Sequence, residues 1–231
     1  MIPLKDTVQS RSFPIVNSIL IGVNIFIFLI EVSLGPQAEA FIAALGVVPA
    51  RLLTAPSLGQ VLTIFTSMFL HGGWFHLFSN MLALYIFGDN VEDRIGHGRY
   101  LAFYLICGII AAITHIAFNA ASPVPTIGAS GAISGVLGAY FILYPRARII
   151  TLVPIFILPW IVEIPAIVYL GFWFLSQLFN GTLAIVAGAQ AFGGVAFWAH
   201  VGGFLAGTIL VGLFARQRYI RRVYVDEYYP W

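Results

Sequence analysis

The chain has 231 residues, of which 60% are hydrophobic and 9% charged, with a mean hydropathy of +0.96 and a net charge of +2. Soluble domains carry about 25% charged residues, so this composition excludes an ordinary soluble domain and indicates an integral membrane protein. The basic residues are dispersed, which argues against a nucleic-acid partner, and the single cysteine, Cys107, excludes an internal disulfide.

Hydropathy predicts six membrane-spanning helices in one domain without internal repeats. We expect the spans at about 14–33, 62–87, 99–118, 130–144, 163–180 and 195–215. The predicted fold is therefore an all-α polytopic bundle over residues 14–215. A cytoplasmic segment, 1–13, precedes it, and a cytoplasmic tail, 216–231, follows it.

The basic residues predict the orientation of these spans. With six crossings and the N-terminus inside, ten of the eleven Lys and Arg residues fall on the inner side, and only Arg51 falls outside. The semi-apolar first outer loop, 34–61, is expected in the membrane interface. The apolar stretch 149–162 contains Pro154 and Pro159, and as a helix it would reach only ~21 Å. We therefore expect an interfacial or re-entrant connection there.

The fourth span is unusually short. It has only 15 residues, from Ser130 to Tyr144, and Gly128 and two prolines precede it. Non-helical backbone at membrane depth is tolerated only where it is buried in protein or lines a wet cavity. The sequence therefore predicts a cavity that opens to the outer face, with Ser130 near its floor.

Ser130 and His200 are predicted at matching depth. Each lies 16 residues before a basic residue that marks the inner surface, Arg146 and Arg216 respectively. At a rise of ~1.5 Å per residue, both side chains lie ~24 Å from that surface. A hydroxyl and an imidazole at one depth are typical of nucleophilic catalysis.

Helix packing suggests how the two groups meet. Gly203 and Gly207 follow His200 at i+3 and i+7 and give its face a strip without side chains, which another helix can approach closely. If the glycine-rich fourth helix is that neighbour, His200 reaches Ser130. The alternatives are a serine that serves close helix packing and a buried histidine bonded to a backbone carbonyl. Ser134, one turn on, is the rival nucleophile.

His76 and Asn80 form a third candidate element. They lie at i and i+4 on one helical face, 18 and 14 residues before Arg94, and so bracket the predicted depth of Ser130. Their side chains offer N–H donors of the kind that stabilises an oxyanion during acyl transfer. The alternative is interhelical hydrogen bonding that holds the bundle. Of the other histidines, we expect His71 at the cavity rim and His115 in a structural role.

Several other site classes lack the residues that they need. The sequence contains no His-Glu-x-x-His motif, and all four aspartates fall at or beyond the inner ends of the predicted spans. A zinc protease and a paired intramembrane aspartate mechanism are therefore unsupported. We predict neither a metal nor a cofactor.

Three motifs in this order resemble the rhomboid family of intramembrane serine proteases, over roughly residues 14–215. The motifs are His76-x-x-x-Asn80, Gly128-Ala129-Ser130-Gly131 and Ala199-His200-x-x-Gly203-x-x-x-Gly207. The resemblance implies a dyad without an orienting aspartate, with Ser130 as nucleophile and His200 as general base. It also implies that Asn80, His76 and the backbone N–H of Ser130 bind the oxyanion.

The implied function is a serine endopeptidase that cleaves transmembrane segments of other membrane proteins near the outer face, through an acyl-enzyme. Its partners are these substrates and the lipid bilayer. Substrates are expected to carry small or helix-weakening residues, and the bulky fifth span, from Trp160 to Phe179, is a candidate gate. We expect a prokaryotic plasma (inner) membrane, with both termini cytoplasmic.

The chain departs from the family pattern in its first outer loop, where Ala50 precedes Arg51 and the Trp-Arg pair of many members is missing. Two other functions remain open at this point. One is a non-catalytic rhomboid-like protein that binds transmembrane clients, although such relatives typically lose the nucleophile or the base. The other is a small polytopic transporter whose polar path these residues would line.

Overall fold

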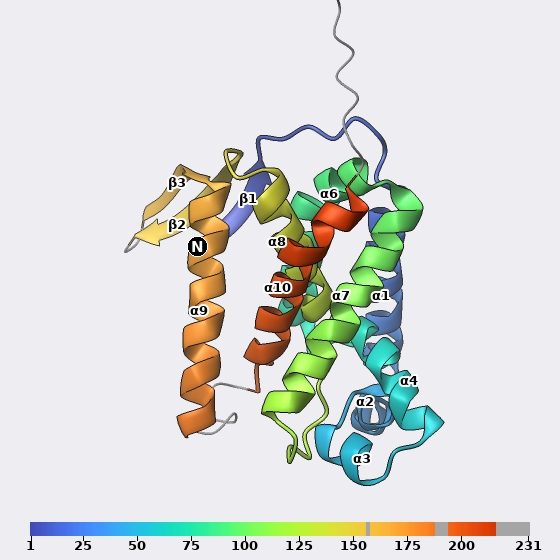
Figure 1. The fold of residues 1–231 in the computed structure, drawn as a ribbon. Helices are drawn as coiled ribbons and strands as arrows, with labels where there is room; N and C mark the ends of the chain where they lie inside the picture. Colours follow the sequence, from blue (N-terminus) through green and yellow to red (C-terminus); the bar gives the residue numbers. More distant parts are fainter. Residues whose placement is uncertain (156–157, 188–193, 216–231) are drawn as a thin grey trace, which may run out of the picture.

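The computed structural model describes residues 1–155, 158–187 and 194–215 and shows a mostly helical polytopic membrane protein (Figure 1). The predicted tail, 216–231, lies outside the described residues. Four of the described helices are long and apolar enough to cross a membrane. They are α1 (Ile15–Ser33), α7 (His97–Phe118), α9 (Ala166–Ala187) and α10 (Phe197–Phe214).

A fifth candidate span is broken. Its two parts are bent by 78° relative to each other at the break between Phe69 and Trp74. The first part comprises α4 (Leu58–Thr66) and η2 (Ser67–Phe69), and the second comprises α5 (Trp74–Ala83), η3 (Leu84–Gly88) and α6 (Asp89–Ile95). The predicted span over 62–87 is therefore not one straight helix.

The predicted fourth span corresponds to α8 (Ser130–Leu143). Its 14 residues are fewer than the roughly 20 that cross a bilayer core. The described helices thus give four or five candidate spans, and the six-span topology stays a prediction. The first outer loop contains η1 (Gly35–Gln37), α2 (Ala38–Leu45) and α3 (Pro49–Thr54).

A small sheet corrects the all-α prediction. Its strands β1 (Ile2–Asp6), β2 (Arg148–Ile155) and β3 (Leu158–Pro165) form an antiparallel sheet in that order, beside one end of α9 (Figure 1). The stretch predicted as an interfacial or re-entrant connection is thus a β-hairpin. Its β-branched residues Ile149, Ile150 and Thr151 favour the extended backbone.

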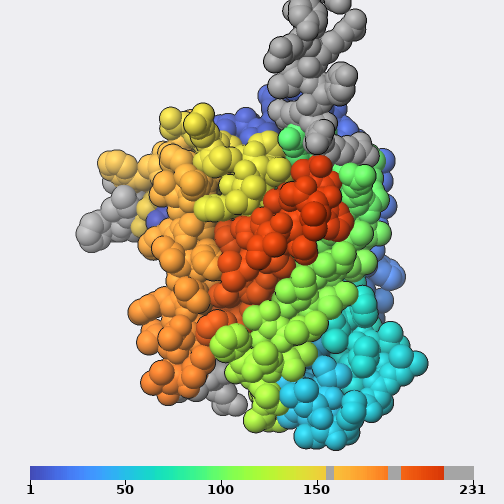
Figure 2. All heavy atoms as spheres, in the orientation of Figure 1, coloured from blue at the N-terminus to red at the C-terminus, as the bar shows by residue number. Residues whose placement is uncertain are grey.

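Helices α8 and α10 pack backbone against backbone. A Cβ atom added to Gly203 would lie 2.0 Å from the carbonyl oxygen of Gly131, and one added to Gly207 would lie 1.9 Å from that of Gly135. These distances leave no room for a side chain, so the predicted strip on the His200 face is confirmed. Figure 2 shows one side of the bundle, on which α10 (red) lies between α9 (orange) and α7 (green).

Gly207→Ala is therefore expected to destabilise the protein, because its methyl group would force α10 away from α8. Overpacking of this kind costs about 1–3 kcal/mol. The matched control is Gly212→Ala in the same helix, where an added Cβ meets nothing within 4 Å. Thermal unfolding in detergent should show a lower midpoint for Gly207→Ala alone. Equal midpoints for the two variants would contradict the close packing.

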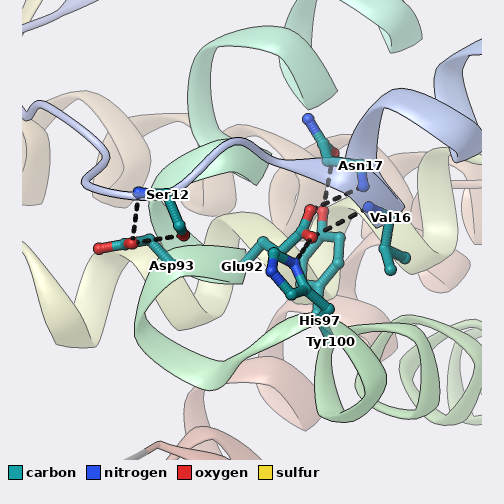
Figure 3. A network of polar contacts seen from close by, with 7 residues as sticks. All are labelled: Ser12, Val16, Asn17, Glu92, Asp93, His97 and Tyr100. Atoms are coloured by element: carbon teal, nitrogen blue, oxygen red, sulfur yellow. Dashed lines mark hydrogen bonds and ion pairs between the residues drawn. The ribbon is translucent and has the colours of Figure 1, made fainter.

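A buried carboxylate, that of Glu92, caps the start of α1 (Figure 3). Pro14 precedes the helix and provides no side-chain cap. Instead, Glu92 of α6 accepts hydrogen bonds from the backbone N–H groups of Val16, at 2.9 Å, and Asn17, at 2.7 Å, and it contacts Nδ1 of His97. A negative charge at a helix N-terminus satisfies free N–H groups and complements the helix dipole. Glu92 therefore fixes α1 to α6 and α7.

Asp6 joins the sheet to the bundle. Its Oδ2 accepts a hydrogen bond from Nδ2 of Asn90 in α6, at 2.9 Å, and another from the hydroxyl of Tyr140 in α8. The side chain is buried, and burial raises the pKa of the Asp6 carboxyl to about 6. The folded state therefore favours the protonated carboxyl.

This raised pKa predicts a pH dependence of stability. The contribution of Asp6 is fully present below the pKa of about 4 in the unfolded chain, and it is lost as the pH rises to about 6. Asp6→Asn, which cannot ionise, should show a smaller loss of thermal stability between pH 4 and pH 6.5 than the wild-type protein. Identical pH profiles for the two proteins would contradict the assignment.

Candidate active site

Ser130 begins α8 immediately after a sharp turn of the chain. The turn is at Gly128, whose φ of +123° favours glycine and whose N–H donates to the carbonyl oxygen of Ser67 at 2.9 Å. The first N–H groups of a helix have no intrahelical acceptor, so that of Ser130 is not used by α8. The turn thus places a hydroxyl and an available backbone donor at one point.

His200 lies in the first turn of α10 and faces Ser130. The distance from its Nε2 to Oγ of Ser130 is 2.8 Å. The glycine contacts between α8 and α10 start one residue after Ser130 and three residues after His200, so the close packing sets this distance. The structure thus brings together the two residues that the sequence places at matching depth.

A third side chain completes the surroundings of the imidazole. Nδ1 of His200 lies 2.8 Å from Oε1 of Gln177, which belongs to α9. No sequence motif pointed to Gln177. One signal was available, since Gln177 is an amide in the middle of a strongly apolar helix. Polar side chains within spans usually face the protein interior, which would have made Gln177 a candidate.

His76 lies on the other side of the turn at Gly128. A Cβ added to Gly128 would lie 2.8 Å from Nε2 of His76 and 3.6 Å from Oγ of Ser130, so both side chains border this turn. The backbone N–H of Gly72 donates to Nδ1 of His76 at 3.4 Å. In the neutral ring the proton is then on Nε2, and this N–H is a donor beside Ser130.

Asn80 lies one turn further along α5. Its side chain is buried, and no described residue accepts a hydrogen bond from its Nδ2. A buried donor without an acceptor costs about 1–3 kcal/mol. This unused donor is suited to an acceptor that enters from outside the chain.

One cavity of about 600 Å³ connects these groups. Its walls come from α5, α8, α9, α10 and the loops before α8 and α10. The polar side chains of its lining are His76, Ser79, Asn80, Thr126, Ser130, Ser134 and His200. All predicted site residues therefore share a single cavity, while its opening to the outer face stays a prediction.

Two other histidines do not contribute to this cavity. His71, expected at the rim, is only 1% exposed, and its ring packs against that of His76 with a centroid distance of 5.1 Å. Nε2 of His115 lies 3.0 Å from the hydroxyl of Thr126 and thus fixes the loop before α8, in agreement with a structural role.

Ser134, the rival nucleophile, has a hydroxyl that donates to the carbonyl oxygen of Ser130 at 2.6 Å. No described base contacts this hydroxyl, in contrast to that of Ser130. Cys107 is fully buried against Gly135. In the described part of the chain, no group of three or more His, Cys, Asp or Glu residues is placed to hold a metal ion.

Comparison with known protein families gives a match over most of the chain. Residues 58–217 match the family described as Rhomboid, the rhomboid domain. This range contains α4 to α10 and all of the candidate site residues.

Individual relatives agree with this match. The rhomboid protease GluP of Bacillus subtilis is 39% identical over 112 residues, which cover 48% of this chain and 21% of that protein. Rhomboid protein 1, mitochondrial, of Saccharomyces cerevisiae is 28% identical over 152 residues, 64% of this chain and 40% of that protein. RHOMBOID-like protein 1 of Arabidopsis thaliana is 39% identical over 80 residues, 35% of this chain and 20% of that protein. The chain thus aligns with less than half the length of each of these relatives.

Proposed function

The chain belongs to the rhomboid family, and from this premise we propose that it is an intramembrane serine endopeptidase. It cleaves transmembrane segments of other membrane proteins near the outer membrane face. Ser130 is the nucleophile, His200 is the general base, and no cofactor takes part. The protein resides in a plasma (inner) membrane with both termini in the cytoplasm.

The observation that carries this proposal is the 2.8 Å contact between Oγ of Ser130 and Nε2 of His200 in a cavity shared with two further donors. A serine hydroxyl is a weak nucleophile unless a base accepts its proton. A binding protein or a transporter needs neither a hydroxyl paired with a base nor an unused buried donor such as Nδ2 of Asn80.

The geometry supports the following reaction. Nε2 of His200 takes the hydroxyl proton as Oγ of Ser130 attacks a peptide carbonyl carbon, and the carbonyl oxygen becomes an oxyanion. Asn80, the Nε2–H of His76 and the backbone N–H of Ser130 stabilise this charge. His200 then gives its proton to the leaving amine, and the peptide bond breaks. Water hydrolyses the ester of Ser130 by the same sequence of proton transfers.

The substrate reaches the cavity laterally from the lipid, between α5 and α9. Phe75 of α5 is 85% exposed at the cavity wall, and Trp173 of α9 lines the same cavity. Only 17% of the apolar 18-residue stretch of α9 is buried inside the protein, against 44% for α10. Of the four long helices, α9 can therefore move with the least loss of packing. A substrate helix uses its carbonyl groups internally. Small or helix-weakening residues therefore favour cleavage, because they allow local unwinding.

The test is a cleavage assay with purified full-length protein in lipid vesicles that also contain a tagged single-span protein with Gly and Ala near its outer end. The proposal predicts two fragments, with a new N-terminus inside or next to the span. A protein that binds or transports clients leaves the substrate intact, and intact substrate in a range of such sequences would overturn the proposal.

A further inference from the structure

We propose that Gln177 is a positioning residue for the reaction and that α9 supplies, through this side chain, the group that holds the tautomer and orientation of His200. The inference rests on the proposed proteolytic function and goes beyond a serine–histidine pair. It assigns a third helix to the geometry of the base.

The hydrogen bonds around Gln177 form a chain that runs in one direction. The hydroxyl of Ser176 donates to the carbonyl oxygen of Trp173 at 2.6 Å, so this hydroxyl oxygen is available as an acceptor. Nε2 of Gln177 donates to it at 3.1 Å. The amide is thereby oriented, and its Oε1 is the atom that lies 2.8 Å from Nδ1 of His200. An amide oxygen only accepts, so Nδ1 carries the proton.

This direction decides what the other imidazole nitrogen does. A neutral imidazole has one N–H, so a proton on Nδ1 leaves Nε2 of His200 with a free lone pair. Nε2 then accepts from the hydroxyl of Ser130 at 2.8 Å, which is the arrangement that a general base requires. The opposite tautomer would direct an N–H at the hydroxyl and leave no base.

Gln177 differs from the carboxylate of a triad in its charge. A neutral amide fixes the ring without a full negative charge to compensate the imidazolium that forms during the reaction. In addition, Gln177 belongs to α9, the least buried of the four long helices, whereas Ser130 and His200 belong to the tightly packed α8 and α10. The orientation of the base therefore depends on the position of α9 against α10.

The test compares three variants with the wild-type protein. Gln177→Met keeps a similar length but removes the amide acceptor, and Gln177→Glu keeps an acceptor at this position. Thr182→Val is the control, because its hydroxyl, on the same helix, only bonds to the carbonyl oxygen of Leu178. For each protein we would measure the rate of labelling by a fluorophosphonate, kcat and KM for a vesicle-borne substrate, and the thermal midpoint.

Gln177→Met is expected to lower both the labelling rate and kcat about 10- to 100-fold, which is the effect of losing one hydrogen bond to a group that becomes charged. KM and the thermal midpoint should change little, and Thr182→Val should match the wild-type protein. Gln177→Glu should recover most of the rate. It should also move the acid limb of the kcat/KM profile to higher pH, because a carboxylate beside Nδ1 favours the protonated ring. The other nearby titratable groups, His76 of α5 and His115 of α7, are unchanged in all variants.

The outcomes separate this inference from the proposed function. If Gln177→Met is labelled at the wild-type rate with an unchanged pH profile, the positioning role is wrong and the protease assignment stands. If kcat falls only in proportion to a lower thermal midpoint, the side chain is structural and the inference is also wrong. If the wild-type protein itself is neither labelled nor active, the failure lies in the proposed function.

Discussion

Ser130→Ala is expected to reduce substrate cleavage by at least about 10⁴-fold, because the variant has no group that can form the acyl-enzyme. His200→Ala should cause a loss of similar size. The two side chains act as one unit across their 2.8 Å contact, so the double variant should be no slower than either single one. The measurement is the initial rate of fragment release in vesicles, followed for long enough to detect residual activity.

Ser134→Ala provides the matched control for this loss. Ser134 is one turn away in the same helix, lines the same cavity and has a hydroxyl that bonds only to the backbone of α8. Its removal should leave cleavage within about a factor of ten of the wild-type rate, as expected for one neutral hydrogen bond. The nucleophile assignment fails if Ser134→Ala is inactive while Ser130→Ala still cleaves.

Asn80→Ala is expected to lower kcat about 10²- to 10³-fold, the effect of removing one donor from an oxyanion site. The physical reason is the Nδ2 donor in the cavity wall, which no described residue uses and which an oxyanion accepts more strongly than a neutral carbonyl oxygen does. The interaction is made mainly in the transition state, so KM should change little. Steady-state kinetics on a vesicle-borne substrate separate the two parameters.

Ser79→Ala is the control for Asn80→Ala. Ser79 is the preceding residue in α5 and lines the same cavity, but its hydroxyl donates to the backbone carbonyl of His76 at 3.0 Å. It should keep nearly the wild-type kcat. A higher KM with unchanged kcat for Asn80→Ala would instead mean that Asn80 binds the substrate in its ground state, and its oxyanion role would be wrong.

The contact between α8 and α10 could be predicted because glycine spacing reports directly on helix packing. Gly203 and Gly207 share the face of His200, and among the other predicted spans the fourth is the richest in glycine. Only a helix with a similarly smooth face can come so near, and this requirement brings Ser130 to His200. The predicted depths of Ser130 and His200 agree with this contact, because both are counted from basic residues at one surface.

Other features depend on contacts that sequence spacing does not encode. The β-hairpin of β2 and β3 pairs with β1, which is more than 140 residues away in the chain. Hydropathy does not report such a distant pairing, and it predicted only an apolar connection. The 78° bend between α4 and α5 lies inside a continuous apolar stretch that reads as one span. The role of Gln177 could not be predicted from helical spacing, because its Oε1 contacts His200, which lies 23 residues further along and belongs to a different helix.

Mapping the site of covalent modification tests the roles of Ser130 and His200 most directly. Purified protein is treated with a fluorophosphonate, digested and mapped by mass spectrometry, in parallel with Ser130→Ala and His200→Ala. We expect a single adduct on Oγ of Ser130 that is absent from both variants. An adduct that persists in Ser130→Ala, or one that forms on Ser130 at the wild-type rate without His200, would contradict these roles.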